Sequence, residues 1–90
     1  MATQTLPNIG DKLAKAIDAE IKRANRHGET FLTLHDAYAV ILEEVDEVWD
    51  ICKQKKRVRS KPALRSELIQ VAAMAIKALK SLDNFTGGKV

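Results

Sequence analysis

The sequence lacks the covalent devices that small domains use to reinforce a limited core. Its 90 residues contain one cysteine, Cys52, which excludes an internal disulfide and a zinc site with several cysteine ligands. A domain of this size typically buries only about 60–65% of its unfolded surface. Because disulfides and structural zinc are excluded, association with another subunit is the remaining source of extra stability.

Long apolar runs are also absent. No segment approaches the roughly 18 apolar residues of a membrane span, and the opening MATQTLPNIG lacks the charged and apolar regions of a signal peptide. Hydrophobic residues nevertheless make up 46% of the chain, which is too apolar for a disordered protein. These features predict a folded, cytoplasmic domain with no membrane partner.

The apolar residues recur at helical spacing and indicate an all-α domain without a convincing strand. Gly28 marks the end of the first helix, Thr33 caps the second, and Ser60 with Pro62 opens the third. The expected segments are helices over about residues 9–27, 34–55 and 61–82, a basic connector over 54–61 and a polar tail over 83–90.

The third helix contains the run LIQVAAMAIKAL, which is apolar almost all the way round. A helix of this kind is expected to be buried, and two partner helices from one short chain can hardly enclose it. We therefore expect a three-helix protomer that forms a four-helix-bundle-like core by oligomerisation, as a homodimer or homotetramer. A loosely packed monomer is the alternative.

Negative charge is concentrated in the segment EEVDEVWD, which begins at Glu43, although the whole chain carries a net charge of +3. At about 100° per residue the five carboxylates share one helix face, and their repulsion costs on the order of 1–2.5 kcal/mol if all are ionised. The same projection places Glu44 and Glu47 beside buried surface and leaves Asp46 and Asp50 in solvent, with Glu43 between the two groups. A partner that offsets this charge is therefore expected.

A sixth carboxylate, Glu67, projects from the third helix into an apolar sector. A buried ionised carboxylate must be paired, coordinated or protonated. Clustered carboxylate oxygens from two helices suit a hard divalent cation such as Mg²⁺ or Mn²⁺. An ion pair between Glu67 and Arg65, Lys77 or a cation of another subunit is equally compatible with the residues.

The motifs EEVDE, from Glu43, and ELIQ, from Glu67, resemble the EExxE…ExxD signature of the MazG-like, all-α nucleoside triphosphate pyrophosphohydrolases. The strings HDAYAVILEEVDEVWD and ELIQVAAMAIKAL are similar to short phage and bacterial members of that group, and the resemblance covers about residues 35–82. It implies attack of water on the α-phosphorus of a (deoxy)nucleoside triphosphate, giving the monophosphate and pyrophosphate.

By this resemblance, Mg²⁺ is held by Glu44, Glu47 and Glu67. Gln70 stands where the family signature has a further acidic residue. The amide oxygen of Gln70 can still coordinate a metal ion or bind a coordinated water, but one negative charge is lost. Weaker metal binding, fewer bound ions or lost activity are the consequences that this departure predicts.

Phosphoryl-type transfer depends on positioning and charge neutralisation, so metal ions held by carboxylates can supply most of the machinery. To orient the attacking water we expect Glu43, and after it Glu47. Basic side chains would also contact the triphosphate. The candidates are Arg59, Lys61 and Arg65 near the start of the third helix, and Lys77 further along it.

A second hypothesis is a non-catalytic, degenerate family member that acts as a helical interaction or nucleic-acid-binding protein. The basic cluster KQKKRVRSK could bind nucleic acid by its charge, although it lacks interleaved aromatic residues. Tyr38 and Trp49 are expected in the core, because both fall on the apolar side of the second helix. His27 and His35 are too isolated in the sequence to be read as ligands.

Overall fold

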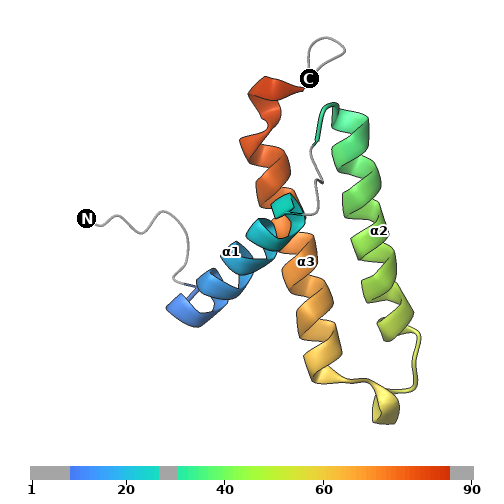
Figure 1. Cartoon of the computed structure of the whole chain (residues 1–90). Helices are drawn as coiled ribbons and strands as arrows, with labels where there is room; N and C mark the ends of the chain where they lie inside the picture. The colour runs from blue at the N-terminus through green and yellow to red at the C-terminus, as the bar shows by residue number, and fades with distance from the viewer. Residues whose placement is uncertain (1–8, 27–30, 86–90) are drawn as a thin grey trace.

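The structure, a computed structural model, describes residues 9–26 and 31–85, and these residues form helices and no strand (Figure 1). The prediction of three α-helices is confirmed, but the second and third end three and two residues earlier than predicted. Two short 3-10 helices follow them. The elements are α1 (Asp11–Arg26), α2 (Leu34–Cys52), η1 (Lys56–Val58), α3 (Lys61–Lys80) and η2 (Leu82–Asn84).

The starts of α2 and α3 are fixed by local side-chain caps. The Thr33 hydroxyl accepts a hydrogen bond from the backbone N–H of Asp36 (3.0 Å), and the Asp36 carboxylate accepts one from the backbone N–H of Thr33 (3.2 Å). At α3 the Ser60 hydroxyl accepts from the Ala63 N–H (3.1 Å), with Pro62 in the first turn. Both predicted starts are confirmed, whereas the predicted stop at Gly28 lies outside the described residues.

The end of α2 is capped by a side chain from further along the chain. The Arg59 guanidinium donates to the backbone carbonyl oxygens of Cys52 (2.8 Å) and Gln54 (3.0 Å). The Cys52 carbonyl is one of those that a helix end leaves without an intrahelical partner, and the Gln54 carbonyl lies two residues beyond the end of α2. Because Arg59 binds them, the chain can leave the helix at Cys52 and turn into the basic connector.

The helix α3 is the centre of the protomer. It packs against both α1 and α2; α2 runs antiparallel beside it, and α1 crosses it (Figure 1). Few side chains are fully buried between these helices, and three of the buried apolar ones are alanines. The buried apolar residues are Ala24, Phe31, Ala37, Ala73 and Met74.

Several large apolar side chains lie outside this small core and remain exposed to solvent. Leu68 and Leu79 of α3 are 49% and 66% exposed, as expected if two helices of one chain cannot enclose α3. The prediction that Tyr38 and Trp49 lie in the core is wrong, because they are 63% and 58% exposed. The apolar residues of α2 form two rows, and the row that includes the small Ala37 is the one that packs on α3.

None of the described helices combines the length and the apolar character needed to cross a membrane.

Candidate metal centre

Three carboxylates named from the sequence come together where α2 meets α3. One oxygen atom from each of Glu44, Glu47 and Glu67 lies within 4.8 Å of the other two. Glu44 and Glu47 are neighbours because residues three apart lie side by side on a helix surface. Glu67 joins them because the antiparallel packing brings the first half of α3 to the second half of α2.

Two of these carboxylates each bury one oxygen atom that has no hydrogen-bond partner. The Oε2 atoms of Glu44 and Glu67 are inaccessible to solvent and accept no hydrogen bond. Within residues 9–26 and 31–85 neither side chain forms an ion pair, so Glu67 does not pair with Arg65 or Lys77 of its own chain. A buried acceptor without a partner costs about 1–3 kcal/mol, so a proton or a cation would be stabilised at these oxygens.

The electrostatics of the cluster oppose ionisation. Burial, a hydrogen bond with Glu47, and the negative charges of Glu47, Glu67 and Glu20 together raise the pKa of Glu44 to about 7. Burial, followed by the charges of Glu47 and Glu20, also raises the pKa of Glu67. With its pKa near 7, Glu44 still carries a proton in a substantial fraction of the molecules at neutral pH, and a bound cation could take the place of that proton.

A fourth carboxylate, Glu20 of α1, belongs to this environment and was not predicted from the sequence. Its side chain is 16% exposed and accepts hydrogen bonds from Nε of Arg23 at 3.0 and 3.1 Å. One sequence feature could have indicated its burial: on the helix projection Glu20 lies about 40° from Ala24, at the margin of the apolar face of α1. Glu20 adds negative charge near Glu44 and Glu67.

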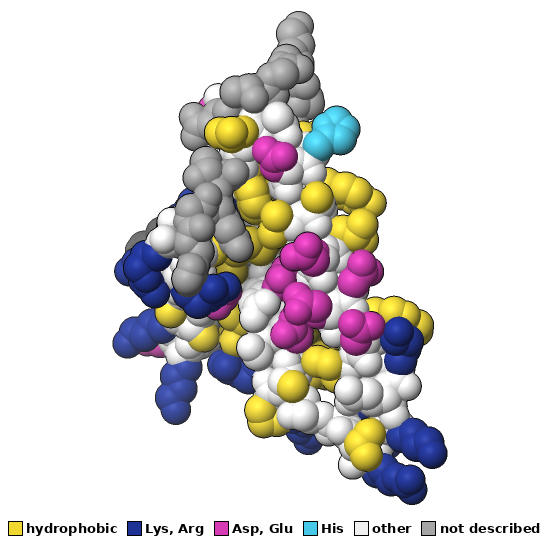
Figure 2. Space-filling model, turned by 45° about the vertical axis from the view of Figure 1, so that its right-hand side comes forward, with side chains coloured by type: hydrophobic (Ala, Val, Ile, Leu, Met, Phe, Trp, Pro, Cys, Tyr) yellow, Lys and Arg dark blue, Asp and Glu magenta, His cyan; other side chains and the backbone are white. Residues whose placement is uncertain are grey.

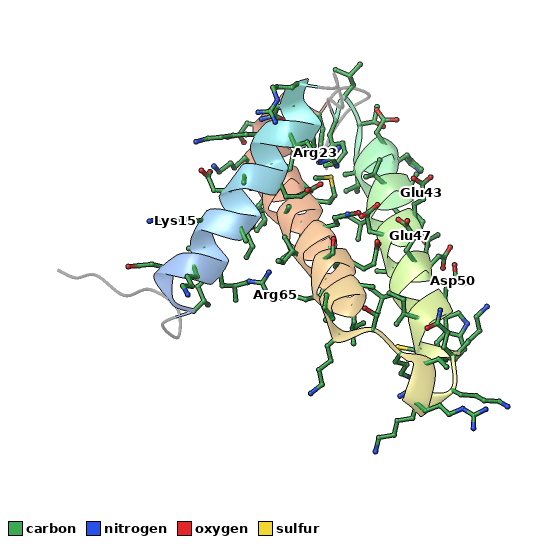
Figure 3. All side chains as sticks on the ribbon, turned by 60° about the horizontal axis from the view of Figure 1, so that its bottom comes forward. Lys15, Arg23, Glu43, Glu47, Asp50 and Arg65 are labelled. Atoms are coloured by element: carbon green, nitrogen blue, oxygen red, sulfur yellow. The ribbon has the colours of Figure 1, made fainter. Side chains whose placement is uncertain are left out.

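The other acidic residues of α2 lie in solvent. Glu43 and Asp50 lie before and after Glu47 along the helix (Figure 3), and most of the acidic side chains in view gather in one central patch (Figure 2). Asp50 pairs with Lys53 at 3.3 Å, both exposed, and Asp46 is exposed as predicted. Glu43 is exposed and is not one of the three clustered carboxylates.

Gln70 lies one turn after Glu67 on α3 and is half-buried. Three residues advance a helix by about 300°, which places Gln70 about 60° around α3 from Glu67. This position is compatible with the amide role expected from the sequence, which stays a prediction.

The basic residues named for phosphate binding occupy different surroundings. Arg59 caps α2, and Lys61 and Arg65 line a groove between α1 and α3 (Figure 3). Arg65 lies about 160° around α3 from Glu67, so the protomer does not gather it beside the carboxylates. Lys77 is 7% exposed, with its Nζ 4.8 Å from the centre of the Phe31 ring. Phosphate binding by these four residues stays a prediction.

Comparison of the chain with known protein families, with curated proteins and with solved structures finds no match. The resemblance to the MazG-like group therefore rests on the sequence motifs and strings alone, and the function must be argued from the site.

Proposed function

We propose that the protein is a Mg²⁺-dependent nucleotide pyrophosphohydrolase of the MazG-like kind, which converts a nucleoside or deoxynucleoside triphosphate to the monophosphate and pyrophosphate. The observation that carries the proposal is the convergence of Glu44, Glu47 and Glu67 within 4.8 Å from two helices. Two of these carboxylates bury an oxygen that accepts no hydrogen bond, which is the condition that a bound cation would relieve.

The donor set fits a hard divalent cation. All three groups offer carboxylate oxygen, which Mg²⁺ and Mn²⁺ prefer, whereas the single thiol, Cys52, is exposed at the end of α2. The charge repulsion that raises the pKa of Glu44 to about 7 favours a cation as it favours a proton. Bound there, Mg²⁺ would neutralise phosphate charge and lower the pKa of a coordinated water.

Hydrolysis also requires a group that orients the attacking water and further oxygen ligands for the metal, and residues beside the cluster would provide them. Glu43 precedes Glu44 and is exposed, so its carboxylate is free to orient a water molecule; Glu47 is the second candidate. Gln70 would contribute an amide oxygen without a charge. A site with this composition is expected to hold its metal less tightly than one with a fourth carboxylate.

We also propose that the chain functions as a homodimer or homotetramer in which a four-helix-bundle-like core is completed between subunits. The support is the exposed apolar surface of α3, where Leu68 and Leu79 are about half or more exposed. A core made mainly of alanine side chains also leaves a 90-residue domain short of buried apolar area.

One observation favours the second candidate, a non-catalytic helical protein that binds nucleic acid. The connector between α2 and α3 exposes Lys53, Lys55, Lys56 and Arg57. Such a cluster can bind phosphates by charge without reference to the carboxylates.

The deciding experiment measures pyrophosphate release from a panel of NTPs and dNTPs with Mg²⁺. We expect turnover by the wild type, its loss in Glu67→Gln, and its retention in Asp50→Asn, which removes a charge from an exposed position of α2. Wild-type release no greater than that of Glu67→Gln would refute the hydrolase. DNA binding that weakens steeply with salt and survives Glu44→Gln would support the second candidate.

A further inference from the structure

The helix α2 carries a second apolar row on its outer side. We call the residues Tyr38, Leu42, Val45 and Trp49 the α2 ridge. They follow one another at spacings of four, three and four residues, and each is at least 41% exposed. This is the spacing of a row that packs along another helix, but no described helix of the protomer covers it.

An apolar groove of about 460 Å³ lies between α1 and α3. Its walls include Leu13 and Ile17 from α1 and Leu64 and Leu68 from α3. Two cations, Lys61 and Arg65, also line it. We call this the α1/α3 groove; its apolar walls and basic rim suit an apolar side chain flanked by acidic groups.

The ridge and the groove open on the same face of the protomer, away from the carboxylate cluster. On α2 the ridge lies about 100° from the row of Ala37 and Val48 that packs on α3, in the direction opposite to Glu47. On α3 the side chain of Leu68 points about 100° away from Glu67. Because α2 and α3 are antiparallel, a turn of about 100° in the chain's own direction is clockwise on one helix and anticlockwise on the other. The ridge of α2 and Leu68 of α3 therefore point to one common face.

We infer that the α1/α3 groove of one copy receives the α2 ridge of a second copy, and reciprocally, in a two-fold symmetric dimer. A two-fold axis parallel to the helices satisfies both contacts at once and lays each α2 antiparallel along the α3 of its partner. Rotation about such an axis does not shift the helices along their length, and Glu44, Glu47 and Glu67 lie at one level of the protomer. The ridge of one copy therefore faces the stretch of the partner's α3 around Leu68, which lines the groove.

The charges of the two surfaces are complementary. The helix α2 carries six carboxylates and no lysine or arginine, whereas α3 carries four lysines and arginines and one carboxylate. Asp46 borders the ridge at about 60° from Trp49, and Lys61 and Arg65 line the groove. The dimer thus places Asp46 of one copy near Lys61 and Arg65 of the other, whereas a like-with-like pairing of two α2 helices would bring carboxylates together.

The inference rests on the self-association proposed above, whose surface it specifies, and it is independent of the proposed hydrolysis. In this dimer both carboxylate clusters remain on the free faces.

Sedimentation and fluorescence test the contact in the full chain. Trp49 is the only tryptophan, so dilution of a wild-type dimer should shift its emission to longer wavelength as the ridge becomes exposed. Val45→Glu on the ridge and Leu68→Glu in the groove should each raise the dimer dissociation constant at least about 30-fold, as loss of a central contact does. Val58→Glu is the matched control, because Val58 is 59% exposed on η1, outside both surfaces.

Mixing the two variants provides the most specific test. A heterodimer of Val45→Glu with Leu68→Glu keeps one intact contact, since both changes fall on the other one, so the mixture should associate more tightly than either variant alone. Far-UV circular dichroism checks the helices, and Val45→Gln with Leu68→Gln replaces the pair if glutamate lowers the helical content.

The outcomes separate the proposals. Variants that dimerise as the wild type does, or a mixture no tighter than its components, would overturn this contact while leaving self-association intact. A wild-type chain that stays monomeric at every concentration would overturn both, and pyrophosphate release would report on the hydrolase independently.

Discussion

Glu44 on α2 and Glu67 on α3 each bury one carboxylate oxygen that accepts no hydrogen bond, and they do so at the same contact between the two helices. Two such acceptors close together destabilise the fold when both are ionised. The free energy of unfolding therefore depends on what neutralises them: a proton, a cation or a substitution.

Metal binding is expected to stabilise the wild type and not Glu67→Gln. A divalent cation at tenfold its dissociation constant stabilises the folded state by about 1.4 kcal/mol, which raises Tm by roughly 5–10 °C in a domain of this size. Without metal, Glu67→Gln should melt above the wild type, because a buried charge has been removed. Thermal melts with and without millimolar Mg²⁺ or Mn²⁺ measure both effects.

The variant Asp50→Asn, at an exposed position of α2, controls for the general loss of negative charge. It should keep the metal-dependent rise in Tm. A wild-type melt that does not respond to metal, or an equal response in Glu67→Gln, would contradict a cation site at the cluster.

The metal-free protein should lose stability as the pH rises from about 4.5 to about 7. In the unfolded chain Glu44 ionises near 4.5, whereas the folded protein retains its proton up to about 7. Between these values the folded state binds more protons, so the free energy of unfolding falls with pH and levels off above 7. We expect a loss on the order of 1–2 kcal/mol after solvent screening.

Urea unfolding at several pH values measures this change, and Glu44→Gln should reduce the slope between pH 4.5 and 7. A variant slope equal to that of the wild type would show that Glu44 is not the group responsible. Because protons and cations compete for the same oxygens, stabilisation by Mg²⁺ should increase over the same rise in pH.

Arg59→Gln should destabilise the protein by about 1–2 kcal/mol. The substitution removes the guanidinium that donates to the carbonyl oxygens of Cys52 and Gln54, and hydrogen bonds to charged groups contribute about 1.5–3 kcal/mol before allowance for exposure. Chemical denaturation measures the change. The exposed neighbour Arg57 provides the control, and an equal loss in Arg57→Gln would indicate an effect of net charge instead of capping.

Thr33→Ala should cost about 1 kcal/mol, because the first turn of α2 loses the acceptor for the Asp36 N–H. Thr33→Ser retains the hydroxyl and should lie within a few tenths of a kcal/mol of the wild type in the same denaturation experiment. If serine and alanine were equally destabilising, the methyl group and not the cap would be the cause.

The features that could be predicted from the sequence are those with local causes. Thr33 and Ser60 start α2 and α3 through residues three positions away, and the spacing from Glu44 to Glu47 defines one side of the cluster. The sequence places the end of α2 three residues too far along the chain. The side chain that caps this end, Arg59, binds the carbonyl of Cys52 seven residues earlier, and helical periodicity does not describe such a contact.

Two further differences have tertiary causes. Periodicity reveals the apolar rows of α2 but does not decide which row meets α3. The row that packs there contains Ala37, whereas Tyr38 and Trp49 lie on the exposed row. The approach of Glu20 to the cluster depends on how α1 crosses α3. No short-range pattern specifies that crossing.

The capping box formed by Thr33 and Asp36 sets where α2 begins, and the direction of every later side chain of α2, in the carboxylate cluster and in the α2 ridge alike, is counted from that start. Deletion of one residue between Asp36 and Glu43 would turn everything beyond it by about 100°. Val45 would then point at α3, and Glu44 would leave the cluster. In related chains we therefore expect length variation to accumulate in the connector after Cys52, and to be tolerated inside α2 only in steps near a whole number of helical turns.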